Sequence, residues 1–327
     1  NTMLEIKDKE EFFKLQNKLE RIPFTQSKGW FDYISHKHKD FVFFVDSLQE
    51  VKIACWGILQ SIPLFSKQIL RIDGECYSQD VNEKVFKTFY TKLSKLPYTA
   101  IEINSNNPYN IDYEIGIRRS GFKRPLGYFS CPLTIEMDFN LDFRFDNNWK
   151  RNVKKTIDKE LIFKEVIDFT PELLLEISKM FKQMADLKGL AYTLEAASLL
   201  TLLSSSDIRT FMVYNNSNIP IAARIIHFDK IYATDIFAAN SNEARNCGAT
   251  YFIMQSIFEK LKKEDFKFFD FGRIPPSNHA TDSIYTFKNA SRGKKVQYNG
   301  EWVLYKSKYM ELLMLFYKMF KLKKQRY

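Results

Sequence analysis

The pattern of apolar and polar residues in the first half of the chain predicts a meander of strands, followed by a helix and a further strand. Runs rich in aromatic and β-branched residues indicate the strands, at 41–45, 51–59, 68–72 and 98–103. Apolar residues at helical spacing predict the helix, at 82–96. Turn-forming residues at 104–110 indicate a break after the last strand.

The second half of the chain repeats this order of elements. Strands are expected at 209–214, 219–228 and 231–238, followed by a helix from about Ala249 and a strand that starts at Phe266. Residue identity between the halves is low, so the repeat is one of element order. We therefore predict an α/β protein built from two tandem units.

A change of character near residue 145 marks the boundary that we expect between the units. The segment 146–160 changes character, and a basic helix with Trp149 near its start is expected at 147–155. We divide the chain accordingly into a first domain, a second domain and a basic C-terminal helix, at 1–145, 146–303 and 304–327.

The C-terminal segment 302–327 is rich in aromatic residues, leucine and methionine, and it is strongly basic. Glu311 is opposed by seven basic residues, which gives a net charge of +6: Lys306, Lys308, Lys318, Lys321, Lys323, Lys324 and Arg326. Such a helix can lie on an anionic membrane surface. Alternatively, it packs its apolar face on the first domain and leaves the lysine tail in solvent. Packing is the favoured interpretation for its first turns.

The composition indicates a folded protein with a basic surface. The chain has 327 residues, of which 45% are hydrophobic and 16% aromatic, enough for one large or two ordinary domains with their own cores. The 49 lysine and arginine residues exceed the 39 acidic residues by 10. This charge favours a polyanionic partner such as nucleic acid, a nucleotide-linked sugar or an anionic membrane surface. A solvated, lysine-rich surface explains the charge equally well.

Several classes of protein are excluded by motifs that the chain lacks. Its four cysteines form no CxxC pair, so neither a zinc site nor a disulfide framework is expected: Cys55, Cys76, Cys131 and Cys247. It has no HxxxH pair and no GxSxG elbow. Residues 1–19 are charged and helical in pattern, so we expect no secretory leader. No uncharged apolar run reaches the roughly 18 to 20 residues that a spanning helix needs. We expect a cytoplasmic protein, either soluble or in peripheral contact with the inner face of the membrane.

Two short motifs resemble those of a known family. In the stretch 266–293, an aromatic strand ends FDFG and is followed by a loop, the pair Phe287-Lys288 and a glycine, while the segment from Phe24 to Trp30 reads F-x-Q-S-x-x-W. Both are similar to motifs of the Fem family of peptidoglycan-bridge aminoacyltransferases, within the acyltransferases built on tandem GNAT folds. The resemblance implies two GNAT-like units that share an interdomain cleft, the first on the acceptor side and the second on the acyl-donor side. No heptad-rich hairpin appears, so we expect a member without the coiled-coil arm.

The resemblance implies a catalytic role for Lys288 and a donor-binding role for Phe287. Lys288 would lie at the acyl-transfer site and stabilise developing negative charge, and Phe287 would pack beside the terminal ribose of the donor. The alternative for Lys288 is an exposed surface lysine. His279, in the loop before Lys288, is a candidate base, although a loop histidine without a partner is more often structural.

Asp270 and Arg273 lie on either side of the glycine that ends the motif's strand. The Asp270 carboxylate is suited to orient an amine or accept its proton, and it is equally suited to cap the turn at Gly272. Arg273 stands where family members often have glycine. It would narrow the site or add a contact to a phosphate.

The loop 240–250, ahead of the second-half helix, resembles the loop that holds a pyrophosphate in GNAT enzymes. Such loops present backbone amides at a helix N-terminus. Arg245, Gly248 and Thr250 match the spacing, with threonine in place of the last small residue. A plain helix-capping loop explains the same residues.

Three basic residues are candidates for binding the phosphates of an acceptor. Fem-type enzymes hold the diphosphate of a cell-wall precursor with basic residues, and the resemblance implies such a role for Lys28, which follows the Q-S pair. Arg151 and Lys154 lie three residues apart and so share a helix face. A solvated basic helix is the competing interpretation.

We expect an acyltransferase that needs no metal and no tightly bound cofactor. It would transfer an amino acid from charged tRNA to an amine of a nucleotide- or lipid-linked peptidoglycan precursor, by positioning and by stabilising charge on the carbonyl oxygen. One alternative is an acyl-CoA-dependent N-acyltransferase that acts on an amino sugar or a polysaccharide precursor. Another is a non-catalytic protein that binds RNA or a membrane surface.

Overall fold

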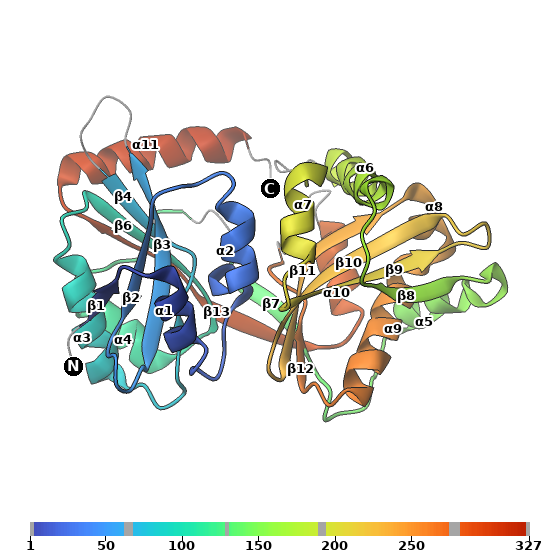
Figure 1. Cartoon of the computed structure of the whole chain (residues 1–327), viewed down its shortest axis with the longest axis horizontal. Helices are drawn as coiled ribbons and strands as arrows, with labels where there is room; N and C mark the ends of the chain where they lie inside the picture. Colours follow the sequence, from blue (N-terminus) through green and yellow to red (C-terminus); the bar gives the residue numbers. More distant parts are fainter. Residues whose placement is uncertain (1–2, 62–67, 128–130, 189–193, 275–281, 325–327) are drawn as a thin grey trace. The chain divides into compact units, whose positions relative to one another are not determined.

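The computed structural model describes residues 3–61, 68–127, 131–188, 194–274 and 282–324. The chain divides into two compact units. Unit 1 consists of Asn1–Ser27, Lys37–Leu133 and Val296–Tyr327, and unit 2 consists of Lys28–His36 and Thr134–Lys295. Figure 1 labels most of the helices and strands of both units.

Unit 1 is built on a mixed sheet. Its strands follow the spatial order β1 (Leu4–Ile6), β2 (Phe41–Val45), β3 (Ile53–Ser61), β4 (Gln68–Ile72), β6 (Ala100–Pro108) and β13 (Lys294–Tyr305), of which the first two residues belong to unit 2. Neighbours are antiparallel, except that β4 and β6 are parallel. The short strand β5 (Cys76–Tyr77) pairs with β3.

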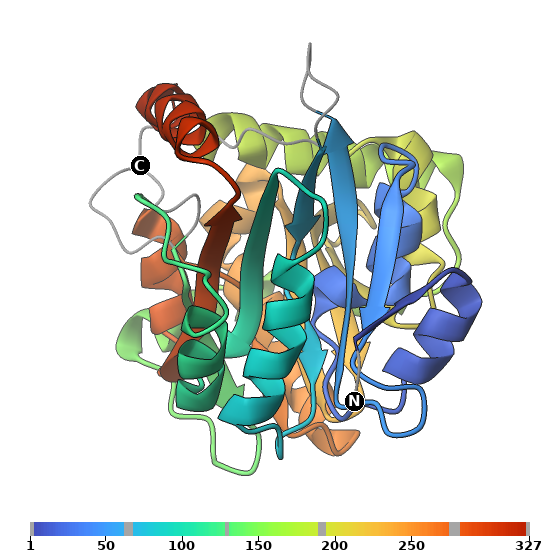
Figure 2. The same cartoon turned by 90° about the vertical axis from the view of Figure 1, so that its left-hand side faces the viewer.

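Helices cover this sheet with apolar side chains. They are α1 (Lys9–Gln16), η1 (Phe24–Gln26), α3 (Glu83–Ser94), α4 (Ile111–Arg118) and α11 (Lys308–Lys324). Asn82 begins α3 by accepting a hydrogen bond from Val85 N, and Phe86 and Phe89 belong to its buried face. Figure 2 shows α3 and α4 on one face of the sheet of unit 1.

Unit 2 has a sheet of the same design. Its strands follow the spatial order β7 (Leu133–Asp138), β12 (Phe268–Asp270), β11 (Tyr232–Asn240), β10 (Pro220–Asp229), β9 (Ile208–Tyr214) and β8 (Ile162–Val166). Here β11 and β12 form the parallel pair and the other neighbours are antiparallel.

The helices of unit 2 include one from the N-terminal region of the chain. They are α2 (Lys28–Ile34), α5 (Asn147–Lys154), η2 (Ile157–Lys159), α6 (Pro171–Lys188), α7 (Ala196–Leu203), α8 (Asn242–Cys247), α9 (Ala249–Lys263) and α10 (Asp282–Asn289). One face of α9 is fully buried, including Ile253, Ile257 and Leu261. Among the described residues, α6 is the longest helix, with 18 residues.

The predicted repeat of element order is confirmed. In unit 1 the helix α3 connects the parallel strands β4 and β6, and in unit 2 the helix α9 lies between the parallel strands β11 and β12. Parallel neighbours require such a crossover because a tight turn cannot join them. Both units therefore share the order meander, helix, parallel strand.

Each unit completes its sheet with a strand from a distant part of the sequence. The strand β7 follows α4 of unit 1 along the chain but pairs with β12 in unit 2. Conversely, β13 follows the helices of unit 2 but pairs with β6 in unit 1. The chain thus passes between the units more than once. The ranges 1–145, 146–303 and 304–327 and their assigned roles stay a prediction.

Two expectations about local structure are wrong. The expected break at 104–110 is mostly strand, since β6 continues to Pro108, and α4 follows directly. Ser105 and Asn107 alternate with more exposed neighbours and are buried on the sheet, where Asn107 Nδ2 donates to Glu75 O at 2.6 Å. These tertiary contacts outweigh the turn preference of serine and asparagine. The segment 302–327, expected to be a helix, starts with the last residues of β13. Trp302 is fully buried, which holds this part of the segment in the sheet of unit 1.

None of the helices in the described ranges combines the length and the apolar composition needed to cross a lipid bilayer. All four cysteines are free thiols; Cys55 and Cys76 are buried, and Cys131 and Cys247 are half-buried.

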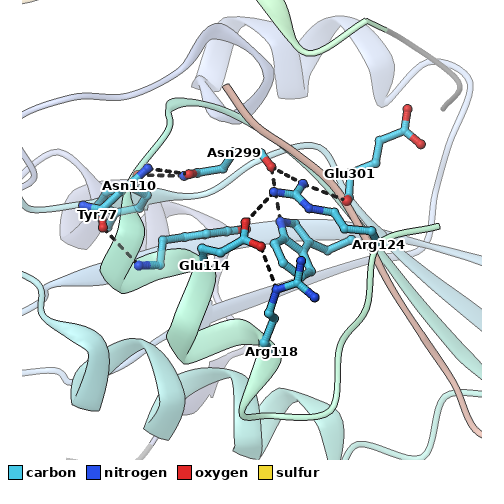
Figure 3. Close-up of polar contacts among 9 residues, drawn as sticks. Tyr77, Asn110, Glu114, Arg118, Arg124, Asn299 and Glu301 are labelled. Carbon is cyan, nitrogen blue, oxygen red and sulfur yellow. Dashed lines mark hydrogen bonds and ion pairs between the residues drawn. The ribbon is translucent and has the colours of Figure 1, made fainter. Parts of the chain in front are cut away.

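A polar cluster around Arg124 ties α4 to β13 in unit 1 (Figure 3). Nη2 of Arg124 donates to Glu114 Oε2 at 2.6 Å, and Nη1 donates to Glu301 O at 3.2 Å and also to Asn299 O. Its Cζ lies 3.9 Å from the ring centroid of Trp302. The guanidinium is thus engaged by neighbouring groups, which is typical of a structural contact.

A buried carboxyl group makes the stability of unit 1 depend on pH. Glu75 is 1% exposed, and Tyr90 Oη donates to its Oε1 at 2.7 Å. Burial raises the pKa of Glu75 from 4.5 to about 7, and the nearby hydroxyl groups of Tyr113, Tyr90 and Ser105 oppose this shift.

We expect the unfolding free energy of unit 1 to fall as pH rises from 4.5 through 7. The folded pKa is raised, so the contribution is fully present below the unfolded pKa and is lost as pH rises through the folded one. The loss is about 3 kcal/mol, since each pKa unit corresponds to about 1.4 kcal/mol. Urea unfolding at pH 5 and pH 8 measures it. Glu75→Gln should remove most of the difference, and the exposed Glu20→Gln should not; an unchanged difference in Glu75→Gln contradicts the assignment.

Candidate functional site

Lys288 lies in the last turn of α10, and its ammonium group binds the segment that follows β12. Nζ donates hydrogen bonds to three consecutive carbonyl oxygens, those of Phe271 at 2.5 Å, Gly272 at 3.2 Å and Arg273 at 3.1 Å. A lysine ammonium has three N–H donors, and these carbonyls match that number. Lys288 therefore fixes a positive charge at the end of β12.

Asp270, the last residue of β12, caps the turn that Lys288 binds. Its buried Oδ1 accepts hydrogen bonds from Gly272 N at 2.7 Å and from Thr134 Oγ1, on β7, at 2.6 Å. Gly272 has φ +70°, and a Cβ there would lie 3.0 Å from Asp235 O, so the turn favours glycine. Asp270 thus caps the turn at Gly272, whereas its role as a base stays a prediction.

The parallel strands β11 and β12 part beside this turn. Their last residue pair joins Thr234 and Asp270, and β11 then continues along β10 to Asn240. A β-bulge interrupts the pairing of β10 with β11 at this point, because Ile236 is an extra residue between Asp235 and Phe237. Bulges are frequent beside functional sites, since they redirect side chains.

A buried ion pair that the sequence analysis missed lies at this bulge. Arg224 Nη1, from β10, is 2.7 Å from Asp235 Oδ2, and both side chains are 5% exposed. Arg224 Nε and Asp235 Oδ1 are buried and have no hydrogen-bond partner among the described residues. A signal for the pair exists in the sequence, namely an arginine within the mainly apolar strand PIAARIIHF.

The charges of these residues influence one another. Burial raises the pKa of the Asp235 carboxyl above its usual value, and the nearby Arg224 and Lys288 oppose this shift. Asp270 acts in the same direction as burial. Two cations and two carboxylates therefore meet where β11 and β12 part.

Phe287 connects this group to an aromatic cluster. Its ring stacks on Trp149 of α5, with centroids 5.6 Å apart and an angle of 20°, and makes an edge contact of 4.9 Å with Tyr251 of α9. Arg224 Cζ lies 5.4 Å from the Phe287 centroid. The motif pair Phe287-Lys288 thus spans the aromatic cluster and the turn after β12.

The sequence of the chain matches no family model and no curated protein, but its structure resembles solved structures. FemX matches with a TM-score of 0.78, 11% identity and coverage of 95% of this chain and 99% of that one. L-PGS from Bacillus licheniformis matches with a TM-score of 0.62, 12% identity and coverage of 94% and 96%. The chain has the tandem GNAT fold of Fem-type proteins. A tandem GNAT protein from the clavulanic acid biosynthesis pathway also matches, with a TM-score of 0.50, 10% identity and coverage of 93% and 98%.

These matches confirm the predicted fold class and the resemblance to the Fem-type fold. At such low identity they establish the fold alone.

This chain forms a short helix, α8, where we expected a loop at 240–250. Ser241 begins α8 by accepting a hydrogen bond from Ala244 N at 3.1 Å, and Gly248, with φ +87°, separates α8 from α9. A Cβ on Gly248 would lie 2.1 Å from Asn152 O of α5. The last turn of α5 therefore lies against the N-terminus of α9.

Arg245 and Thr250 lie at the same junction. Arg245 Nη1 donates to Asn240 O at 2.9 Å, and its Nη2 donates to Asn242 Oδ1. Thr250 belongs to the first turn of α9 and is half-buried. Their role in binding a donor stays a prediction.

The three predicted acceptor-binding residues lie in unit 2. Lys28 is the first residue of α2, and its Nζ is 2.9 Å from Asp32 Oδ2. Arg151 and Lys154 are exposed on α5, and Arg151 Nη2 donates to Asn148 Oδ1 at 2.9 Å. Arg151 and Lys154 thus share the helix that touches Phe287 and the start of α9. Their phosphate-binding role stays a prediction, as does that of Lys28.

Histidines do not form a metal centre in the described ranges, where no group of three or more metal-binding side chains occurs. Burial lowers the pKa of His227 to about 4, although Asp207 lies 3.7 Å away and opposes the shift. His36 Nε2 forms a hydrogen bond of 2.9 Å with Thr201 Oγ1. His279, the candidate base, lies outside the described residues.

A cavity of about 330 Å³ lies between α5, η2 and α9. Its lining includes the carboxylates of Glu160 and Glu259 but no lysine or arginine. It includes none of the predicted site residues. An anionic ligand does not fit such a lining.

Proposed function

We propose that this protein transfers an aminoacyl group from charged tRNA to an amine of a peptidoglycan precursor. The observation that carries the proposal is the position of Phe287 and Lys288, beside the point where the parallel strands of unit 2 part. The Fem-type fold supports it. The acceptor would be a nucleotide- or lipid-linked saccharide carrying a peptide amine.

In this reaction the neutral amine attacks the carbonyl carbon of the aminoacyl ester. A C–N bond forms, the ester C–O bond breaks, and the ribose hydroxyl leaves with the proton that the amine loses. Lys288 would stabilise the negative charge on the carbonyl oxygen by exchanging one of its three carbonyl partners for that oxygen. Asp270 would hold the turn and orient the amine, and Phe287 would pack beside the terminal ribose.

The basic residues supply binding sites for the phosphates of both substrates in this proposal. Arg151 and Lys154, which share α5, would bind the precursor's diphosphate. Lys28 belongs to α2, which packs with α6 and α7, so it would make a separate phosphate contact. Arg245 with Arg273 would contact the donor. Gly248 and Thr250, at the junction of α8 and α9, would contact the donor without binding a pyrophosphate. Because the Asn152 carbonyl approaches Gly248 so closely, the start of α9 is poorly suited to an acyl-CoA pyrophosphate.

The test is binding of the purified chain to three ligands at low and moderate salt. These are charged tRNA, acetyl-coenzyme A and a nucleotide-linked muramyl peptide. We expect salt-sensitive tRNA binding and saturable muramyl-peptide binding, and formation of an aminoacylated muramyl peptide when both are present. Coenzyme A binding without any preference for charged tRNA would overturn the proposal and favour an acyl-CoA-dependent N-acyltransferase.

A further inference from the structure

The helix α11 packs on unit 1 through a narrow strip of its surface. Met310 and Met314 are buried, and they form a small core with Ile69 of β4 and Ala100 of β6. An ion pair between Lys123 and Glu311 adds a polar contact at one side. These contacts use positions i and i+4 of the helix, which lie on one face.

Beyond Lys308 and Glu311, much of the described surface of the helix is apolar and in contact with water. Six large side chains there are between 38% and 66% exposed: Tyr309, Leu312, Leu313, Phe316, Tyr317 and Met319. Their spacing of three and four residues gathers most of them on the side opposite Met310 and Met314. Figure 2 shows α11 in red at the outside of unit 1. An exposed apolar stripe of this kind marks a surface that binds something.

The positive charge near these six exposed apolar side chains, called here the apolar stripe of α11, indicates which kind of partner fits. Between residues 306 and 326 the sequence has seven basic residues and one acidic residue, and Lys306 and Lys308 are exposed at the start of α11. Such a surface repels a second copy of itself. A nucleic acid would match the charge but would leave the leucine and phenylalanine side chains in water. A bilayer that contains anionic lipids satisfies both features, because acyl chains cover the stripe and headgroups pair with the lysines.

We propose that α11 is a membrane-binding helix that lies in the plane of an anionic bilayer surface. Leu312, Leu313 and Phe316 enter the boundary between headgroups and acyl chains, and the two tyrosines lie at headgroup level, where amphipathic rings are favoured. The chain is held at the surface and does not cross it. This inference does not rest on the proposed aminoacyl transfer.

The test compares binding to vesicles of phosphatidylcholine alone with binding to vesicles of equal parts phosphatidylcholine and phosphatidylglycerol, by co-sedimentation. We expect the whole protein to bind the anionic vesicles and to lose binding as salt is raised. The double variant Leu312→Glu/Phe316→Glu should bind at least ten times more weakly. A matched control, Ile111→Glu/Leu126→Glu, makes the same change at two side chains of unit 1 that are 63% and 66% exposed, and it should bind normally.

Three results would overturn the proposal. They are absence of binding to anionic vesicles by the unaltered protein, equal loss in both double variants, and a dimer in light scattering that only Leu312→Glu/Phe316→Glu dissolves. The last result would assign the stripe to a second copy of the chain. Circular dichroism of each variant establishes that the helices are intact, and the comparison of the two vesicle types requires no variant. Aminoacyl transfer to a soluble muramyl peptide, measured in parallel, separates failure of this proposal from failure of the proposed function.

Discussion

Lys288→Met is expected to lower the rate of aminoacyl transfer by about 100-fold to 1,000-fold, the usual effect of removing one group that stabilises an oxyanion. Methionine has nearly the length of lysine but no charge and no N–H donor. The loss should appear mainly in kcat, because the developing charge exists only in the transition state. Steady-state rates with charged tRNA and a muramyl peptide measure the effect.

The control for Lys288→Met must separate its chemistry from its structural contacts, because Nζ also binds the three carbonyls after β12. Thr134→Val is suited to this purpose. It removes the hydroxyl that lies 2.6 Å from Asp270 Oδ1 and 2.9 Å from Gly272 O, so it weakens the same turn and keeps the lysine. We expect a loss below about tenfold for Thr134→Val, in line with one hydrogen bond. Equal losses in both variants would mean that Lys288 acts only on the turn.

The repeated architecture was predictable because its signals are local. Alternating apolar residues and helical spacing each need only a short window of sequence, and they indicated β4, α3 and β6 as well as β11, α9 and β12. The exchange of β7 and β13 was not predictable in this way. Which sheet a strand joins depends on partners more than a hundred residues away, and nothing in the local pattern of β7 or β13 names those partners.

The site residues that belong to a sequence motif were predictable, whereas those that only packing brings together were not. The Phe287-Lys288 pair was visible as a motif, but its partners Phe271 to Arg273 depend on the path of the turn after β12. Ser241 caps the helix α8, which lies where we expected a loop. A serine is equally common in loops, so the sequence does not distinguish the two. Arg224 was overlooked because an arginine is normally exposed.

The buried pair of Arg224 and Asp235 leads to the second large effect. Arg224→Met should lower the unfolding free energy by about 3–5 kcal/mol, because it leaves Asp235 buried without its hydrogen-bonded partner. The pKa of Asp235, already raised by burial, should rise further. A raised folded pKa makes the loss small at acidic pH and larger as pH rises through that pKa. Guanidinium unfolding at pH 5 and pH 8 measures both the size and the sign.

The double variant Arg224→Met/Asp235→Leu decides whether the two charges form one unit. Replacing both by apolar residues leaves no uncompensated charge, so it should lie within about 1–2 kcal/mol of the unaltered protein and above Arg224→Met alone. Lys179→Met is the matched control in unit 2. Its ion pair with Glu176 is about half exposed on both sides, so we expect a change below about 0.5 kcal/mol. Asp235→Leu alone completes the cycle; if the double variant instead loses the sum of the losses in Arg224→Met and Asp235→Leu, the two residues contribute independently. In that case the bulge in β11 and the turn after β12, and not this ion pair, would stabilise the local structure where β11 and β12 separate.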